Sequence, residues 1–379
     1  MAVYNSAALC PLAMPLLASL LHRYFSSMAP IPRPKSVSIR DVAELAGVSL
    51  GSASRVINKV DNVTAKTREK VEQAIAALAY RPNHAAQSLR LRTTRTIGCL
   101  LTDVTNPLYA KLFRALEERM RTAGYMMLLA NSLNVAEREI DILSTFQSRG
   151  MDGVILAPGN ERDRDVLNAI HGMGVPVVLL DRDIKSKTDQ VHFNHVPGMH
   201  GVVSRLAALG HQRIALIVTQ SPNRPMRRRI EGFRSGMQAH SLPVEDEFIV
   251  RLPTAMSAAF AAVTSLLQRS DRPTAIVAMG TNILNETLNA ISNLNMRIPK
   301  DISVVSIGDP DFAASYAPAI SSLRVDLDAA AQASTELLLS RLRGTGGSKP
   351  RCVMIDCHYI ERQSCGPPPA SMGKPMRRR

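Results

Sequence analysis

Strand-like apolar runs alternate with helical stripes through residues 95–365, and this alternation limits the possible folds more than any other feature. Alternating strands and helices form parallel sheets that helices cover on both faces. Seven such strands exceed one comfortable sheet, and helices such as 107–123 and 258–268 are expected between them. The expected strands are Thr96–Thr102, Tyr125–Asn131, Gly153–Ala157, Pro176–Leu180, Arg213–Thr219, Thr274–Met279 and Ser303–Gly308.

An all-α segment is predicted before these runs, over residues 37–81. Ser38, with Asp41 three residues later, has the capping-box pattern that starts a helix. Gly47 ends that helix, and Ser49 can cap a second helix over 50–58. A third helix is expected from Thr64. Two helices joined by a short glycine-containing turn are typical of the helix-turn-helix, whose second helix enters the major groove of DNA.

A competing interpretation comes from residues 47–51, which match the GxSxG pattern of hydrolase nucleophile elbows. That elbow requires a strand before the serine, whereas a helix is predicted before Ser49. No GxGxxG, P-loop or HExxH pattern occurs, and the glycine-rich run 344–347 follows a predicted helix. We therefore expect no catalytic residue and no cofactor.

Composition limits the classes of binding partner and the kinds of site that the chain can have. Lys and Arg number 46 against 32 Asp and Glu, and the net charge of +14 favours a polyanion or a membrane surface. Aromatic residues are only 4%, so stacking platforms for single-stranded nucleic acid are scarce. The five cysteines are scattered without a CxxC pair. We therefore expect neither a metal site nor a disulfide framework. The cysteines are expected to be reduced thiols in the cytoplasm.

The two ends of the chain differ from the rest. The apolar run within residues 1–27 is interrupted by Pro11 and Pro15 and is too short to span a membrane. It also lacks a preceding basic region, which disfavours a signal peptide. We interpret 1–36 as a disordered arm or as a mis-assigned start, with Met28 as the alternative first residue. Residues 366–379 are expected to form a basic tail.

The segments IRDVAELAGVSLGSASRVINKVDNVTAKTREKV and YRPNHAAQSLR closely resemble the DNA-binding headpiece of the lactose repressor family. Segments in family order follow, among them DVTNPLYAKLFRALEERM, VPVVLLDRD, RRRIEGF and RIPKDISVVSIGD. The resemblance covers about 37–365. It implies an all-α helix-turn-helix headpiece (37–81), a hinge helix and linker (82–94), and an α/β two-lobed core of the periplasmic-binding-protein type with two Rossmann-like parallel sheets. Its lobes would be 95–193 with 324–346, and 194–323 with 347–365.

The resemblance also implies roles for residues of the headpiece and hinge. Leu50, Gly51 and Arg55 fall at base-reading positions. Small residues such as Ala85 would let two hinge helices pack in a homodimer, and Leu89 would wedge into the minor groove. The residues that fall where the family contacts phosphates or flanks the bases are Ser49, Ser52, Ser54 and Asn58.

A small-molecule effector is expected between the two lobes, at the carboxyl ends of their strands. Relatives hold their effector with an arginine at the position of Arg229, and an arginine fork suits carboxylates. Arg224, Arg227, Arg228 and Arg229 together favour an acidic ligand, such as a sugar acid of the gluconate type, over a neutral sugar. The expected effector contacts are Tyr109, Asp181, Arg182, Arg229, Asn282 and Asp309.

These features predict a homodimeric, ligand-responsive transcriptional regulator, most simply a repressor. It would bind a palindromic double-stranded operator and respond to a sugar or sugar acid, in the cytoplasm and without a membrane partner. A solute-binding protein for transport would share the two lobes, and an enzyme would share the folds. Neither alternative has a use for residues 39–90, which separate the regulator from both.

Overall fold

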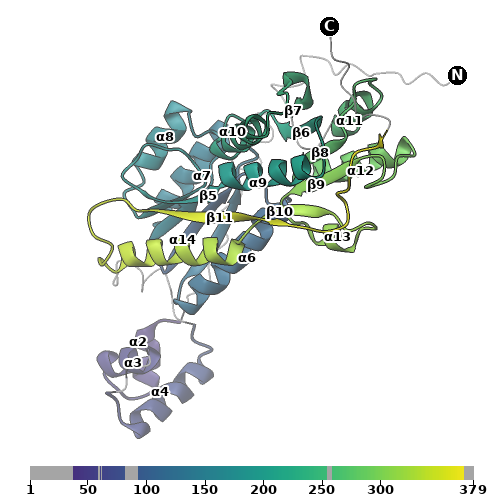
Figure 1. Ribbon diagram of the computed structural model, residues 1–379. Helices are drawn as coiled ribbons and strands as arrows, with labels where there is room; N and C mark the ends of the chain where they lie inside the picture. Colours follow the sequence, from purple (N-terminus) through teal and green to yellow (C-terminus); the bar gives the residue numbers. More distant parts are fainter. Residues whose placement is uncertain (1–36, 59, 61, 82–92, 254–257, 371–379) are drawn as a thin grey trace, which may run out of the picture. The chain divides into compact units, whose positions relative to one another are not determined.

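The computed structural model describes residues 37–58, 60, 62–81, 93–253 and 258–370 (Figure 1). The chain divides into two compact units, the first ending at Leu91 and the second beginning at Arg92. The expected arm (1–36), most of the hinge, including Ala85 and Leu89, and the last nine residues lie outside the described residues. No helix in the described part is long and apolar enough to cross a bilayer.

The first unit is the predicted three-helix headpiece. Its helices are α2 (Ile39–Leu45), α3 (Leu50–Ile57) and α4 (Ala65–Ala77). Ser38 forms the complete capping box with Asp41, and Ser49 and Thr64 cap the next two helices. Gly47 takes the tight turn with φ of +61°. The helices pack on a small apolar core that includes Val42, Ala43, Ala53, Val56, Val71 and Ala74.

The first lobe of the second unit is a parallel sheet with helices on both faces. The strand order is β2 (Met126–Asn131), β1 (Thr96–Leu101), β3 (Gly153–Leu156), β4 (Val177–Leu180) and β5 (Asp189–Asn194). One apolar core joins this sheet to α6 (Pro107–Thr122) and α14 (Leu327–Leu342). Another joins it to α7 (Ala136–Ser148) and α8 (Arg164–His171).

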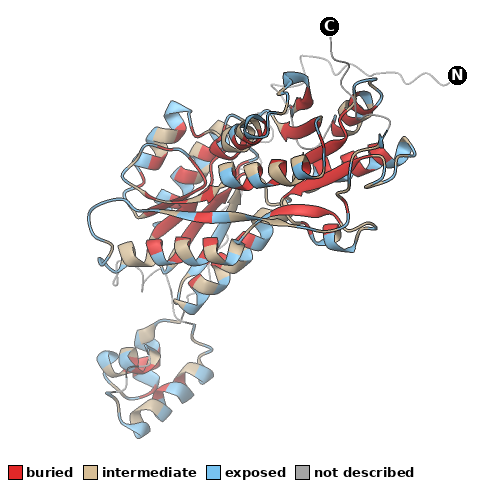
Figure 2. Cartoon of the chain, viewed as in Figure 1, coloured by how far each residue is buried: buried red, intermediate tan, exposed pale blue. Residues whose placement is uncertain are grey.

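The second lobe repeats this plan. Its parallel strands are β7 (Ile249–Leu252), β6 (Ile214–Thr219), β8 (Ala275–Met279), β9 (Ser303–Ile307) and β10 (Ser321–Val325). Helices α9 (His195–Ala208) and α10 (Arg224–Ala239) pack on one face. On the other face lie α11 (Ala259–Leu267), α12 (Gly280–Asn293) and the short α13 (Asp311–Ser315). Figure 2 shows the central strands of both lobes buried and the outward helix faces exposed, whereas the edge strand β2 is largely exposed.

One strand belongs to both lobes. The first half of β11 (Cys352–Ile360) pairs in parallel with β5, with Met354 opposite His192. Its second half pairs antiparallel with β10, with Tyr359 opposite Leu323. The two sheets are therefore continuous through β11, which runs across both lobes in Figure 1. This corrects the assignment of 347–365 to the second lobe alone.

The expected tail does not begin at residue 366. The Gly366 carbonyl lies 3.1 Å from the Ser303 hydroxyl and 2.9 Å from Nε2 of the buried His211. The Gly366 N–H in turn donates to Ser303 Oγ at 3.1 Å. These bonds fix the segment to the second lobe, because a buried hydroxyl and imidazole need partners.

Candidate nucleic-acid interface and binding cavity

Helix α3 has one buried and one exposed face. Ala53 and Val56 are buried in the headpiece core, while Arg55 is exposed and Leu50 is 45% exposed. A Cβ on Gly51 would meet only Ser49 Oγ, at 3.9 Å, so this position has open space beside it. The exposed face therefore presents an apolar side chain and a bare backbone in the first turn of the helix and an arginine in its last turn. In a helix-turn-helix this helix lies in the major groove, where its side chains contact base edges.

The polar residues of α3 are tied to its two ends. Ser49 Oγ accepts the Ser52 N–H at 3.2 Å and caps the helix. The Asn58 amide donates to the Ser54 carbonyl at 2.7 Å and closes the other end. Because helix α2, and not a strand, precedes Ser49, the hydrolase interpretation of residues 47–51 is wrong.

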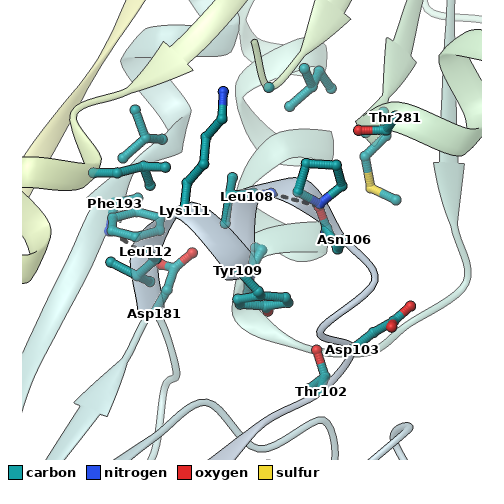
Figure 3. Close-up of a pocket in the computed structure, with 18 of the residues that line it drawn as sticks. Thr102, Asp103, Asn106, Leu108, Tyr109, Lys111, Leu112, Asp181, Phe193 and Thr281 are labelled. Atoms are coloured by element: carbon teal, nitrogen blue, oxygen red, sulfur yellow. Dashed lines mark hydrogen bonds between the residues drawn. The ribbon is translucent and has the colours of Figure 1, made fainter. Parts of the chain in front are cut away.

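A cavity of about 1480 Å³ lies between the two lobes of the second unit. Strand ends from both lobes supply its wall, as expected for parallel sheets. Figure 3 shows Thr102, Tyr109, Asp181 and Phe193 from the first lobe and Thr281 from the second. Other lining residues that matter below are Arg182, Arg229, Asp309 and Arg362.

Asp181 lines the cavity, but its carboxylate is bound within the protein. Oδ2 accepts from Nε2 of His195 at 2.7 Å, and Oδ1 accepts the Phe193 N–H at 3.2 Å and an Arg224 N–H. Burial opposes ionisation here, yet His195 and Arg224 hold the pKa of Asp181 far below its ordinary value. Asp181 is thus a compensated anion at the cavity wall.

Arg182 is also committed to the protein. Its buried guanidinium donates to the Asp181 carbonyl at 2.9 Å and the Ala157 carbonyl at 3.2 Å. Nη2, which donates to Ala157, also lies 3.4 Å from the hydroxyl of Tyr109. Arg182 therefore orients Tyr109 and satisfies the carbonyl groups beyond β3 and β4.

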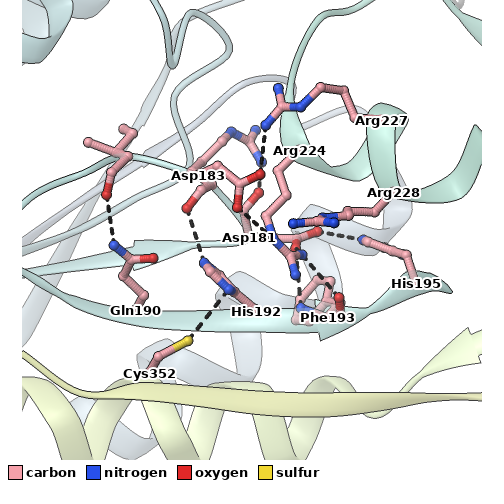
Figure 4. A network of polar contacts seen from close by, with 12 residues as sticks. Asp181, Asp183, Gln190, His192, Phe193, His195, Arg224, Arg227, Arg228 and Cys352 are labelled. Atoms are coloured by element: carbon pink, nitrogen blue, oxygen red, sulfur yellow. Dashed lines mark hydrogen bonds and ion pairs between the residues drawn. The ribbon is translucent and has the colours of Figure 1, made fainter. Parts of the chain in front are cut away.

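The arginines of α10 are not the free basic patch that the sequence suggested. Arg224 pairs with Asp181, and Arg227 pairs with Asp183 at 2.7 Å (Figure 4). Arg227 also pairs with Glu161 at 2.5 Å, and Arg228 pairs with Glu231 on the surface. These partners neutralise three of the four positive charges.

Arg229 is the exception. It lines the cavity, its buried Nε has no hydrogen-bond partner, and no described carboxylate forms an ion pair with it. Burial lowers the pKa of Arg229, and Asp181 is the carboxylate that opposes this most strongly.

The remaining two expected contacts have different outcomes. Asp309 lines the cavity but is held by Arg362 in a bidentate pair, with distances of 2.8 and 3.0 Å. Although burial opposes it, this pair keeps the pKa of Asp309 below its ordinary value. Asn282 is exposed and is not part of the lining, where Thr281 stands instead. Arg362 and Phe193 also line the cavity, and no sequence signal pointed to either of them. Among the described residues, no cluster of His, Cys, Asp or Glu could hold a metal ion.

Comparisons with known proteins agree with this architecture. The profile of bacterial regulatory proteins of the lacI family matches residues 38–83, and that of the periplasmic binding protein-like domain matches 203–365. The ribose operon repressor of Escherichia coli K12 is 30% identical over 80% of this chain and 93% of its own length. The transcriptional repressor PurR of Photobacterium profundum is 29% identical over 81% of this chain and 92% of its own length.

A solved structure is similar over both units. The lac repressor dimer bound to operator and the anti-inducer ONPF matches 87% of this chain and 99% of its own, with 26% identity and a TM-score of 0.77. Both named relatives are transcriptional repressors. The chain is therefore a ligand-responsive, DNA-binding transcriptional regulator, and it belongs to the lacI family of bacterial regulatory proteins.

Proposed function

We propose that this regulator binds a palindromic operator as a homodimer and reads bases with the exposed face of α3. Leu50 contacts a thymine methyl, and Arg55 pairs with a guanine edge. Gly51 allows the backbone to approach the groove. Phosphate and flanking contacts come from Ser49, Ser52, Ser54 and Asn58. The support is the exposure of this face together with the operator-bound lac repressor dimer, and the site of action would be the cytoplasm.

The edge strand β2 supports the homodimer. This strand is the outermost one of the first lobe, and it exposes three large apolar side chains: Met126 (62% exposed), Leu128 (37%) and Leu129 (40%). Exposed apolar edge strands are rare because they invite pairing with another chain. A second copy covering this edge would remove them from water. Leu128→Glu should then give a monomer in analytical ultracentrifugation, whereas a dimer of unchanged stability would exclude this interface.

The effector is proposed to be a small anion, and a sugar acid fits best. We define the inter-lobe cluster as Glu161, Asp181, Asp183, Arg182, Arg224, Arg227 and Arg229. Three carboxylates in it face four guanidinium groups. Arg182 and Arg229 both line the cavity, but Arg182 donates to the carbonyl groups of Asp181 and Ala157, so Arg229 is the guanidinium in excess. This excess charge is the observation that carries the proposal, because a partly buried charge without a carboxylate partner is costly and a ligand anion would compensate it.

The hydroxyl groups of such a ligand have partners in the cavity wall, which includes Thr102 and Thr281. Relatives also point to carbohydrates: one carries the name of a ribose operon repressor, and one solved structure, 25% identical, is a regulator in complex with cellobiose. A carboxylated sugar satisfies both the polar wall and Arg229.

Two measurements test the proposal. The full chain is titrated calorimetrically with matched pairs of acid and neutral ligand: D-glucuronate and D-glucose, D-galacturonate and D-galactose, D-gluconate and D-glucitol. Tighter binding of an acid is expected, and binding of neutral members alone would overturn the anionic effector. Duplexes are then selected from a random library at about 150 mM salt, where counterion-driven binding is suppressed. A palindrome is expected, and its enrichment should change when the acid is added.

A further inference from the structure

We propose that Arg224 sets the preference of the cavity for an acid over a neutral sugar, although Arg224 does not line the cavity itself. It would do so by occupying Asp181, so that Arg229 remains free for the ligand. This inference rests on the proposed anionic effector and adds the residue that determines the specificity.

Arg224 reaches from the second lobe to the first. It is the first residue of α10, its side chain is 6% exposed, and it is not among the residues that line the cavity. Its Nη1 pairs with Asp181 Oδ1 and donates to the Phe193 carbonyl at 3.0 Å. Its Nε lies 3.1 Å from Asp183 Oδ1. The guanidinium therefore approaches Asp181 from outside the cavity.

Without this guanidinium, Asp181 would have a different partner. Asp181 and Arg229 line the same cavity, and Asp181 is the carboxylate that acts most strongly on Arg229. The other hydrogen-bond partners of the Asp181 carboxylate are the backbone N–H of Phe193 and the buried ring of His195, and the Arg182 guanidinium, itself committed to carbonyl groups, also acts on it. Once Arg224 is removed, the inter-lobe cluster contains three carboxylates and three guanidinium groups. Asp181 and Arg229 then compensate each other, and a paired carboxylate and guanidinium bind neutral hydroxyl groups as well as they bind an acid.

The alternative is that Arg224 only holds the two lobes together. A loosened cavity would weaken the binding of acids and of neutral sugars by the same factor, so the ratio of their dissociation constants would not change. The ratio therefore separates an effect on specificity from an effect on structure.

The experiment uses the full chain and the three matched ligand pairs named above. In Arg224→Met the preference for the acid should fall at least tenfold, the factor expected for loss of one charge-assisted hydrogen bond. The double variant Arg224→Met/Asp181→Asn restores one guanidinium in excess and should regain the wild-type preference to within about threefold. Arg228→Met is the matched control, because Arg228 pairs with Glu231 on the surface, and it should leave the ratio unchanged.

The outcomes are distinct. If wild-type protein prefers no acid, the proposed effector class is wrong. If it prefers an acid and Arg224→Met keeps that ratio, or the double variant fails to restore it, the role of Arg224 is wrong. If circular dichroism shows that Arg224→Met does not fold, the variant Asp181→Asn tests the inference instead, because it leaves a second guanidinium without a compensating carboxylate. The acid preference should then rise, and an unchanged or lower preference would overturn the inference.

Discussion

Replacing Arg229 with methionine should raise the stability of the ligand-free protein and at the same time remove its affinity for acids. The side chain places a charged group in the cavity wall, with its Nε buried and without a partner. An unsatisfied buried donor costs about 1–3 kcal/mol, and an unpaired buried charge costs more. Methionine keeps most of the apolar stem and removes the charge. We expect a gain of about 1–2 kcal/mol in the free energy of unfolding, allowing for partial solvation from the cavity.

The assay is thermal unfolding followed by circular dichroism, because the chain has no tryptophan to report by fluorescence. For a unit of this size, each kcal/mol moves the midpoint by roughly 2–4 °C. The variant should therefore melt a few degrees above wild type without ligand. It should also lose the rise in midpoint that an acid gives wild type, because about 1.5–3 kcal/mol of binding disappears with the charge-assisted hydrogen bond.

Arg228→Met is again the control, since its surface pair with Glu231 contributes at most a few tenths of a kcal/mol. A lower melting temperature for Arg229→Met without ligand, together with an undiminished response to the acid, would refute the reasoning. It would mean that the guanidinium is satisfied inside the protein and that the ligand binds elsewhere.

Three further predictions concern the headpiece and the second lobe. Arg55→Ala should cost roughly 1–3 kcal/mol of operator affinity and relax one base pair in a selection experiment, whereas a uniform loss on all duplexes would make Arg55 a phosphate contact. Gly51→Ala fits the open space beside α3 and should stabilise the headpiece by about 0.5–1 kcal/mol while changing the preferred base at one position; a destabilised headpiece in urea unfolding would contradict this. Burial lowers the pKa of His211 to about 4, so the unfolded chain takes up a proton first as the pH falls below about 6.5. The stability of the core should then decrease by about 2 kcal/mol between pH 7 and pH 5, and His211→Gln should remove that part of the pH dependence in urea unfolding.

The sequence predicted the headpiece most closely because its signals are local. Ser38, Ser49 and Thr64 are capping residues within three positions of the N–H groups they accept from, and α3 ends within one residue of its predicted end. Four strands, β5, β7, β10 and β11, were not predicted as strands. Of these, β5 and β11 are only partly buried and lack a continuous apolar run. The family resemblance placed a lobe boundary at the end of β5, but it assigned β11 to the second lobe alone, and the double pairing of β11 could not be derived from its own residues.

The cavity shows a different limit of sequence reasoning. A residue that follows a buried strand, such as Asp181, can be placed at the site, but whether its charge is available depends on partners elsewhere in the chain. Arg224 lies 43 positions from Asp181, and Arg362 lies 53 positions from Asp309. Both aspartates line the cavity and both are neutralised, whereas Arg229, the last of a run of three arginines, is not. The charge offered to a ligand is therefore a property of these pairings. A substitution outside the cavity can change the class of ligand that the regulator senses, even when every lining residue is retained.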